Sequence, residues 1–292
     1  MQGKRIALIL FLCILIGHAS SAQARLIIQN KGSDSLVNVA QAWAEAFQRL
    51  RPDVAIAVTG GGSSIGIASL LHNTIDIANS SREIQPRELA IAEKNGIQPV
   101  KHLLGYDALL IFVHPDNPLT SLTLPQLADM YGEGGKSKRW SDLGVSVPGC
   151  SNQRIILASR QSNSGTYFFF REQILGERRD FALGTKDLHS SKDVVELVAK
   201  NPCAIGYSGL AYAHPNIKIL PIALQEGSPA ITPSMSTAID KSYPLSRPLL
   251  MYTPGEAKNF VKEYLQWIKS DQGQCILFNK GYAPYRPLHC PQ

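Results

Sequence analysis

The chain has 292 residues, with 29 Lys and Arg against 23 Asp and Glu and a formal net charge of +6 at pH 7. This mild excess is compatible with an anionic ligand, but the densest basic run, "GKSKRW" at 135–140, is better explained as a solvated loop than as a nucleic-acid surface. After the first 24 residues, no apolar run reaches the roughly 20 residues that a membrane-spanning helix needs. The length that remains suits one large or two modest domains.

The N-terminus, residues 1–24, has the pattern of a secretory signal peptide. It has a basic start at Lys4, an apolar run over 6–16 and small residues up to Ala24. The apolar run is too short to span a membrane, and Cys13 lacks the small residues that precede the cysteine of a lipoprotein cleavage site. We therefore expect cleavage after Ala24 and export to the periplasm.

Four cysteines follow this leader, at positions 150, 203, 275 and 290. An even number in an oxidising compartment indicates two disulfides, for which three pairings are open. Cys150 and Cys203 each precede a strand-like run, and these runs could lie side by side. We favour Cys150 with Cys203 and Cys275 with Cys290. Zinc is the alternative, but no pair has the spacing of metal ligands, so no metal site is expected.

Hydrophobic periodicity predicts alternating strands and helices in the first hundred residues. Strands are expected at 25–30, 54–59 and 74–81, and helices at 36–50, 65–73 and 86–96. The first helix places seven apolar residues on one face: Leu36, Val39, Ala40, Trp43, Ala44, Phe47 and Leu50. A repeated order of strand, turn and helix is typical of an α/β fold with a mainly parallel sheet.

Two long strands, expected at 106–114 and 243–253, enclose a middle block of α/β character. That block contains a helix with a capping box at Thr123 and Gln126, strands at 154–160 and 204–213, helices at 166–175 and 190–201, and a loop-rich stretch at 225–242. A helix at 255–270 follows the second long strand. This order predicts two lobes joined by two crossing strands, with the last helix returning to the first lobe.

The stretch "TGGGSSIG" at 59–66 is compatible with more than one chemistry. A phosphate loop needs G-x-x-x-x-G-K-[ST], but the only Gly-Lys-Ser, at 135–137, lies in a polar loop without the first glycine. Gly62, Ser64 and Gly66 match G-x-S-x-G between a strand and a helix, so an exported serine hydrolase using Ser64 stays an alternative. Its histidine would have to be one of three without a distinctive setting: His189, His214 or His289.

A third interpretation uses four turns that each join a strand to a helix: 32–35, 60–64, 79–83 and 162–166. A helix N-terminus presents unpaired N–H groups and partial positive charge, and serine and threonine hydroxyls add donors. Any one of these turns is most simply a helix cap. Four together, with Arg160 just before the last, predict a cage for a small oxyanion. Trp43 and the run 168–170 are expected in the core rather than against a ligand.

With these motifs, residues 26–252 resemble the periplasmic phosphate-binding proteins, the solute receptors of phosphate ABC importers. The resemblance is carried by "KGSDSLVNVAQAWAEAF", "VTGGGSSIGIASLL", "DIANSSRE", "LTLPQLADMYG" with "WSDLG", "SRQSNSGTYFF" and "AIGYSGLAYA". It implies an α/β, type II periplasmic binding protein fold, whose two lobes are joined by a two-strand hinge with the ligand in the cleft. The boundaries we expect are 25–107 with 245–292 for the first lobe and 108–244 for the second.

The resemblance also implies a function. The chain would be a monomeric receptor, not an enzyme, that binds inorganic phosphate without a cofactor and delivers it to a membrane-embedded ABC permease. Another oxyanion, such as sulfate, is the alternative ligand. Matching by position implies the following phosphate ligands: Ser35, the backbone of Leu36, Ser63, Ser81, Arg160, Ser164, Gly165 and Thr166. Ser33, Asp34, Ser64 and Arg82 are further candidates.

One position departs from the family pattern. Some members have an aspartate at the end of the third strand, where this chain has Ser81. Phosphate near neutral pH still carries a proton and sulfate carries none, so a carboxylate acceptor can favour phosphate. We therefore hypothesise that Asp34 takes the acceptor role, although a helix-start aspartate favoured by the helix dipole explains it equally well.

Overall fold

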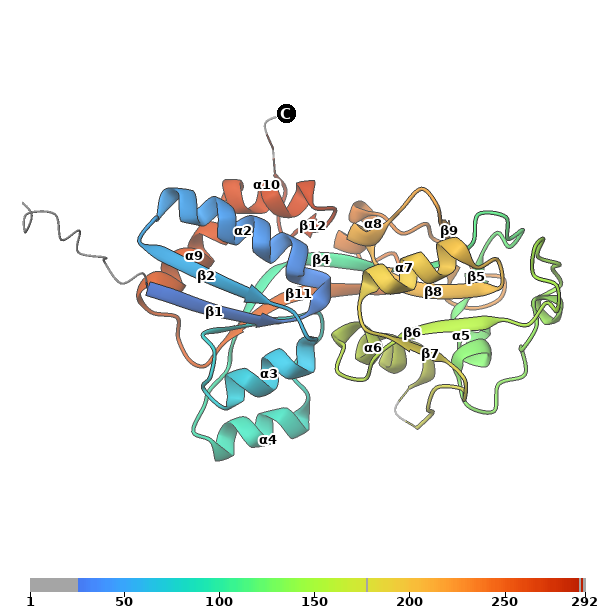
Figure 1. The fold of residues 1–292 in the computed structure, drawn as a ribbon, viewed down its shortest axis with the longest axis horizontal. Coiled ribbons are helices and arrows are strands. Elements are labelled where there is room, and N and C mark those ends of the chain that lie inside the picture. Colours follow the sequence, from blue (N-terminus) through green and yellow to red (C-terminus); the bar gives the residue numbers. More distant parts are fainter. Residues whose placement is uncertain (1–25, 177, 289, 291–292) are drawn as a thin grey trace, which may run out of the picture.

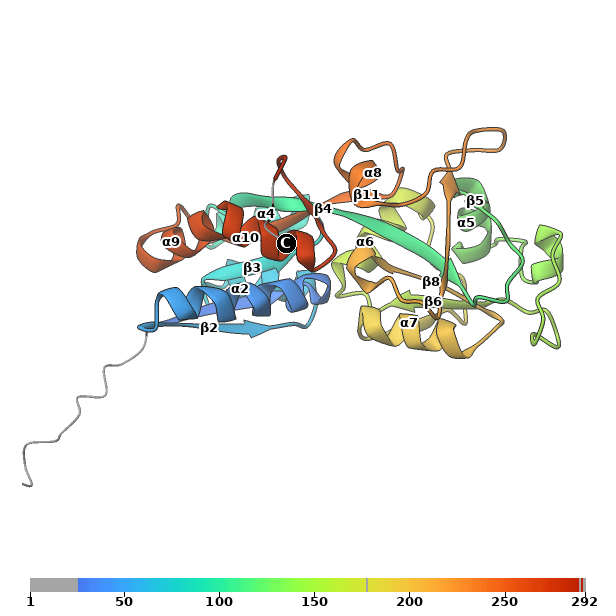
Figure 2. The ribbon, with the colours of Figure 1, turned by 90° about the horizontal axis from the view of Figure 1, so that it is seen from above.

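The computed structural model describes residues 26–176, 178–288 and 290, so the predicted leader lies outside the described residues. A ten-stranded sheet runs through two lobes in the order β2-β1-β3-β11-β4-β8-β6-β7, and β9 and β12 also pair with β4 (Figures 1 and 2). In this part of the chain, no helix is both long enough and apolar enough to cross a membrane.

The first lobe is built on three parallel strands at its sheet edge: β1 (Leu26–Gly32), β2 (Val54–Thr59) and β3 (Ile77–Ser80). Its helices are α2 (Val37–Leu50), α3 (Ser63–Leu71), α4 (Pro86–Lys94), α9 (Asn259–Ile268) and α10 (Asp271–Asn279), with a 3₁₀ turn η1 (Asp34–Leu36). α2, α9 and α10 cover one face of the sheet, and α3 and α4 cover the other (Figure 1). The predicted apolar face of α2 is in the core, where Trp43 is fully buried and donates to the Gly273 carbonyl at 2.7 Å.

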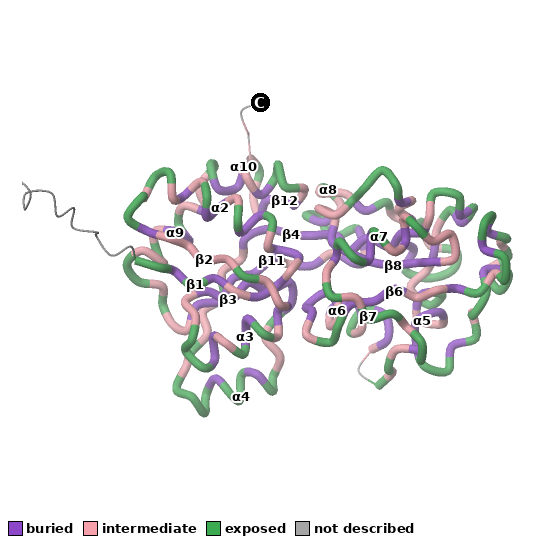
Figure 3. The backbone as a smooth tube through the Cα atoms, in the orientation of Figure 1, coloured by how far each residue is buried: buried purple, intermediate pink, exposed green. Residues whose placement is uncertain are grey.

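Two long strands connect the lobes. β4 (Val100–Val113) pairs with β11 (Ser246–Thr253) over residues 100–108, with β8 over residues 109–113 and with β9 over residues 111–113. The prediction of two long strands here is correct, but β4 begins six residues earlier than expected, because the polar residues Lys101 and His102 interrupt the apolar run in the sequence but not the pairing with β11. Buried residues continue without a break along the second part of β4 (Figure 3).

The second lobe has its own hydrophobic cores on the two sides of its sheet. Its strands are β5 (Leu122–Thr123), β6 (Ile156–Arg160), β7 (Lys186–Leu188), β8 (Ala204–Gly209), β9 (Lys218–Leu220) and β10 (Ile222–Ala223); β5 and β10 form a separate pair. Its helical segments are α5 (Leu124–Tyr131), η2 (Trp140–Leu143), α6 (Gly165–Phe170), the π-helical η3 (Arg171–Leu175), α7 (Ser191–Lys200), η4 (Leu210–Tyr212) and α8 (Met235–Ile239). α5 begins with the predicted capping box, in which Thr123 accepts from the Gln126 amide.

The C-terminal part differs from the expectation. The predicted helix at 255–270 is shorter, as α9, and α10 follows it directly because the Ser270 side chain caps a new helix start. The short strand β12 (Ala283–Pro284) then pairs with β4 and closes the first lobe. The loop-rich stretch also contains one unpredicted helix, α8, capped by Ser234.

Two disulfides join Cys150 to Cys203 and Cys275 to Cys290, which is the pairing favoured from the sequence. The first links the segment before β6 to the segment before β8, and these two strands are indeed neighbours in the sheet. The second ties α10 to the C-terminal segment.

Candidate functional site

The four turns predicted from the sequence meet between the two lobes. Three of them follow β1, β2 and β3, and because these strands are parallel, their carboxyl ends lie at one edge of the first lobe. In Figure 1 the arrowheads of β1 and β2 face the second lobe, from which the fourth turn follows β6. Ligands of open α/β sheets bind at such carboxyl edges.

A group of buried hydroxyls forms the centre of this region. Ser33 and Ser81 lie 3.1 Å apart between their Oγ atoms, and Ser63 Oγ accepts from the Ser81 amide at 3.2 Å. Across the lobes, Ser35 Oγ lies 3.0 Å from Thr166 Oγ1. All five side chains are at most 2% exposed. Three turns of the first lobe and the start of α6 therefore bring their donors to one enclosed place.

Two glycines allow the lobes to come this close. A Cβ at Gly165 would lie 2.2 Å from Ser63 Oγ and 2.6 Å from Ser81 Oγ, and one at Gly62 would lie 2.4 Å from the Asn163 carbonyl oxygen. Gly62 also has a φ of +97°, which L side chains rarely adopt. Next to Gly165, Ser164 caps α6 by accepting from the Thr166 amide at 3.1 Å. These contacts require glycine at both positions.

Arg160, at the end of β6, brings a buried positive charge from the second lobe. It donates to Asp34 Oδ2 at 3.0 Å, to Ser191 Oγ at 3.0 Å and to the His189 carbonyl at 2.7 Å. Burial lowers the pKa of Arg160, and the Asp34 carboxylate opposes this effect; an arginine so placed stays charged at neutral pH. Its Nε is buried and has no partner among the described atoms.

Asp34 is held from both lobes, since its Oδ1 also accepts from the Gly61 amide at 2.9 Å and its backbone carbonyl accepts from Tyr212 Oη at 2.9 Å. Burial raises the pKa of Tyr212 to about 12, so this hydroxyl keeps its proton. Leu36 is fully buried beside it, but its amide already donates to the Ser33 carbonyl at 3.1 Å. The Leu36 amide, one of the predicted phosphate donors, therefore already donates its hydrogen bond within its own turn.

Ser64 and Arg82 lie together at the side of this cluster. Arg82 donates to Ser64 Oγ at 2.9 Å and forms a buried ion pair with Glu88 at 2.7 Å, and its guanidinium lies over the Phe168 ring of the second lobe. Among the described residues no histidine hydrogen-bonds to Ser64, whose oxygen instead accepts from an arginine. This setting does not favour a nucleophilic role for Ser64.

Two residues beside the cluster were not among the sequence candidates. Arg247 on β11 donates to Thr166 Oγ1 at 2.9 Å, to Ser35 Oγ at 3.3 Å and to Asp107 on β4 at 2.7 Å. Both members of this ion pair are fully buried. The one signal in the sequence is a single charged residue in each of two mainly apolar segments, "YDALLIFV" and "SRPLLMY".

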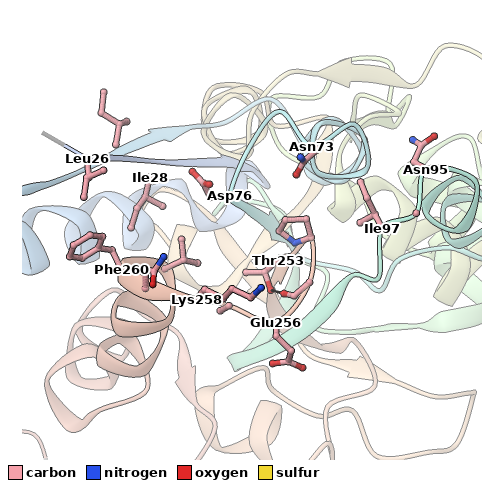
Figure 4. Close-up of a pocket in the computed structure, with 17 residues that line it drawn as sticks. Leu26, Ile28, Asn73, Asp76, Asn95, Ile97, Thr253, Glu256, Lys258 and Phe260 are labelled. Carbon is pink, nitrogen blue, oxygen red and sulfur yellow. Dashed lines mark hydrogen bonds between the residues drawn. The ribbon is translucent and has the colours of Figure 1, made fainter. Parts of the chain in front are cut away.

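A separate hollow of about 640 Å³ lies at the far end of the first lobe (Figure 4). It is lined from β1, the turn after α3 and the segment 253–261, and its labelled residues include Asp76, Glu256 and Lys258. None of the predicted binding residues lines it. Within the described chain, no group of three or more His, Cys, Asp or Glu side chains could hold a metal ion.

The chain is similar to known proteins along most of its length. Residues 17–272 match the PBP superfamily domain. The chain is 33% identical over 269 residues to the phosphate-binding protein PstS of Pseudomonas aeruginosa, covering 88% of this chain and 82% of that protein. It is 31% identical over 263 residues to the protein SphX of Synechococcus elongatus, covering 85% and 75%.

Two solved structures have the same fold. One is a putative phosphate ABC transporter substrate-binding protein with bound phosphate from Clostridium perfringens, with a TM-score of 0.78, 28% identity, and coverage of 89% of this chain and all of that one. The other is an ABC-type phosphate transport receptor from Vibrio cholerae, with a TM-score of 0.71, 27% identity and the same coverage. The chain therefore has the type II periplasmic binding protein fold and belongs to the PBP superfamily, in the family of the phosphate-binding protein PstS.

Proposed function

We propose that this protein is a receptor that binds inorganic phosphate between its two lobes and delivers it to an ABC-type permease. The observation that carries the proposal is the enclosed cluster of hydroxyls from four turns, together with the buried Arg160, which pairs with Asp34 across the lobes. The names of its relatives support the choice of phosphate as the ligand.

Recognition would replace the water around the anion by fixed donors. Ser35, Ser63, Ser81, Ser164 and Thr166 carry hydroxyls, and Arg160 adds the charge that desolvation of an anion requires. The unpartnered Arg160 Nε supports this role, because a buried donor without a partner calls for an acceptor. No bond is made or broken in such a site, so the proposal is a binding protein rather than an enzyme.

Asp34 is the acceptor in this proposal. Its two oxygens accept one hydrogen bond each from Gly61 and Arg160, and an ionised carboxylate has about four acceptor positions in all. One of the remaining positions can accept the proton that phosphate keeps near neutral pH. Sulfate has no such proton and would meet a bare negative charge.

Binding is coupled to closure of the lobes. Arg160 with Asp34, Thr166 with Ser35 and Asn163 with Ser64 and Gly61 are contacts between the lobes. A ligand that touches both sides stabilises the closed form and shifts the population toward it. The lobe boundaries we propose are 25–107 with 245–292, and 108–244, with β4 and β11 as the hinge.

The proposed location is the periplasm. The sequence of the leader and the two disulfides support export to an oxidising compartment. A permease in the adjacent membrane would receive the ligand from a monomeric receptor.

Titration calorimetry tests this function. Protein stripped of bound anion by unfolding and refolding is titrated with phosphate, arsenate and sulfate at neutral pH. The expected result is saturable binding of one phosphate per chain, similar binding of arsenate and much weaker binding of sulfate. Tight sulfate binding would make sulfate the ligand, and no heat from any of the three would reject the receptor function.

A further inference from the structure

The hinge contains a buried ion pair that the predicted site does not include. Arg247 on β11 and Asp107 on β4 are directly opposite each other in the strand register, and both side chains are 0% exposed. Arg247 donates to Asp107 Oδ2 from Nε at 3.0 Å and from Nη2 at 2.7 Å. The second carboxylate oxygen accepts from the Leu210 amide at 2.8 Å, so Asp107 also holds the end of β8. The pair is therefore fixed to the strands that join the lobes.

The other side of the Arg247 guanidinium reaches the anion cluster. Nη1 donates to Thr166 Oγ1 in the second lobe at 2.9 Å, and Nη2 donates to Ser35 Oγ in the first lobe at 3.3 Å. Arginine has only donors, so each of these bonds occupies a lone pair on a hydroxyl oxygen. Arg247 therefore contacts one predicted ligand from each lobe.

The hydrogen bonds among Ser35, Thr166 and Arg247 leave one hydroxyl proton without an acceptor. Ser35 Oγ and Thr166 Oγ1 are 3.0 Å apart, so one hydroxyl donates to the other. The oxygen that receives this bond also receives one from Arg247, and both of its lone pairs are then in use. Its own O–H finds no acceptor in this group of three residues. A buried O–H of this kind requires an acceptor from outside the group.

We infer that Arg247 is a positioning residue for the anion site: it orients the Ser35 and Thr166 hydroxyls so that a proton is directed at a ligand oxygen. Asp107 neutralises the buried charge and holds the guanidinium in place. This inference rests on the proposed function, since the ligand oxygen is taken to belong to phosphate. Through Arg247, the hinge strand β11 contacts one predicted ligand hydroxyl in each lobe.

Arg247→Lys tests the inference, because one ammonium keeps the charge beside Asp107 but cannot reproduce the two-nitrogen contact with the hydroxyls. We expect the phosphate Kd of the variant to rise about tenfold, the effect of losing well-aligned hydrogen bonds. In a Ser35→Ala/Thr166→Val background the same substitution should change Kd less than about twofold, because Arg247 then has no hydroxyl to orient. A purely structural role would give the same weakening in both backgrounds.

The control is Tyr243→Phe, which removes another buried hydrogen bond near the hinge, from Tyr243 Oη to the Leu109 carbonyl at 2.8 Å. Its Kd should equal that of the unsubstituted protein. If Arg247→Lys does not fold, as judged by circular dichroism, Asp107→Asn/Arg247→Gln replaces it and carries the same expectation. Phosphate binding that is insensitive to Arg247, or equally sensitive in both backgrounds, overturns the inference alone. No phosphate binding by the unsubstituted protein overturns the proposed function and the inference with it.

Discussion

Two polar regions of the described chain differ in how their side chains are held: the hydroxyl cluster between the lobes and the hollow of Figure 4. Between the lobes, Ser63, Ser81, Arg160 and Thr166 are at most 1% exposed, and each is fixed by hydrogen bonds from another turn or strand. In the hollow of Figure 4, Glu256 and Lys258 are exposed and only the first lobe contributes. Fixed donors in a water-poor place interact more strongly with an anion than mobile charges in solvent. We therefore place the proposed anion site among the enclosed, converging side chains between the lobes rather than in the open hollow.

The largest effect should come from removing the positive charge of the enclosed site. Arg160→Met leaves Asp34 facing the anion without its partner, so we expect the phosphate Kd to rise about 100-fold or more. Calorimetry measures the change, and Arg160→Lys, which keeps the charge, should lose less. If Arg160→Met binds phosphate as tightly as the unsubstituted protein, Arg160 is not part of the site.

Closure of the enclosed site should depend on Gly165. A methyl group there would lie 2.2 Å from Ser63 Oγ and 2.6 Å from Ser81 Oγ, and opening of the lobes is the simplest relief. We expect Gly165→Ala to weaken phosphate binding about tenfold, equivalent to about 1.4 kcal/mol of closure free energy. The matched control is Gly255→Ala in the hollow, where a Cβ would meet nothing within 4 Å and should leave Kd unchanged. Equal effects of the two substitutions would contradict the comparison.

The selectivity of the enclosed site should depend on Asp34. Asn at this position removes the negative charge that disfavours sulfate, so Asp34→Asn should reduce the preference for phosphate over sulfate about tenfold. The ratio of the two Kd values measures this, and it is independent of any general loss of affinity from the broken pair with Arg160. An unchanged ratio means that another group distinguishes the two anions.

The smallest effect should come from the hollow. Lys258→Ala removes an exposed positive charge that lines it, and we expect the phosphate Kd to stay within about twofold, as for exposed charges elsewhere on a surface. A loss as large as that of Arg160→Met would place the anion in the hollow instead.

Much of the fold could be predicted from local sequence. The apolar face of α2 repeats at helical spacing, and the helix was expected at 36–50 and found at 37–50. The four serine-rich turns could also be found, because each joins a recognisable strand to a recognisable helix. The convergence of the first three turns follows from the parallel order of β1, β2 and β3.

The parts that could not be predicted depend on pairing across long distances. Asp107 and Arg247 are 140 residues apart in the sequence, and their ion pair exists because β4 and β11 align in one register. In the sequence each is the single charge in a short, mainly apolar segment, which does not indicate a partner. α10 was not predicted for a local reason, because Gly273 and the polar residues at its start weaken the helical pattern in the sequence. Its stability comes instead from packing on α2 and α9.

The most direct test of the central claim is a crystal structure of the protein with arsenate, in which the anomalous signal of arsenic locates the anion. We expect one peak between the lobes, within hydrogen-bond distance of Arg160 and the hydroxyls of Ser63 and Thr166. A peak in the hollow of Figure 4, or none between the lobes at a concentration that saturates binding in solution, would contradict it.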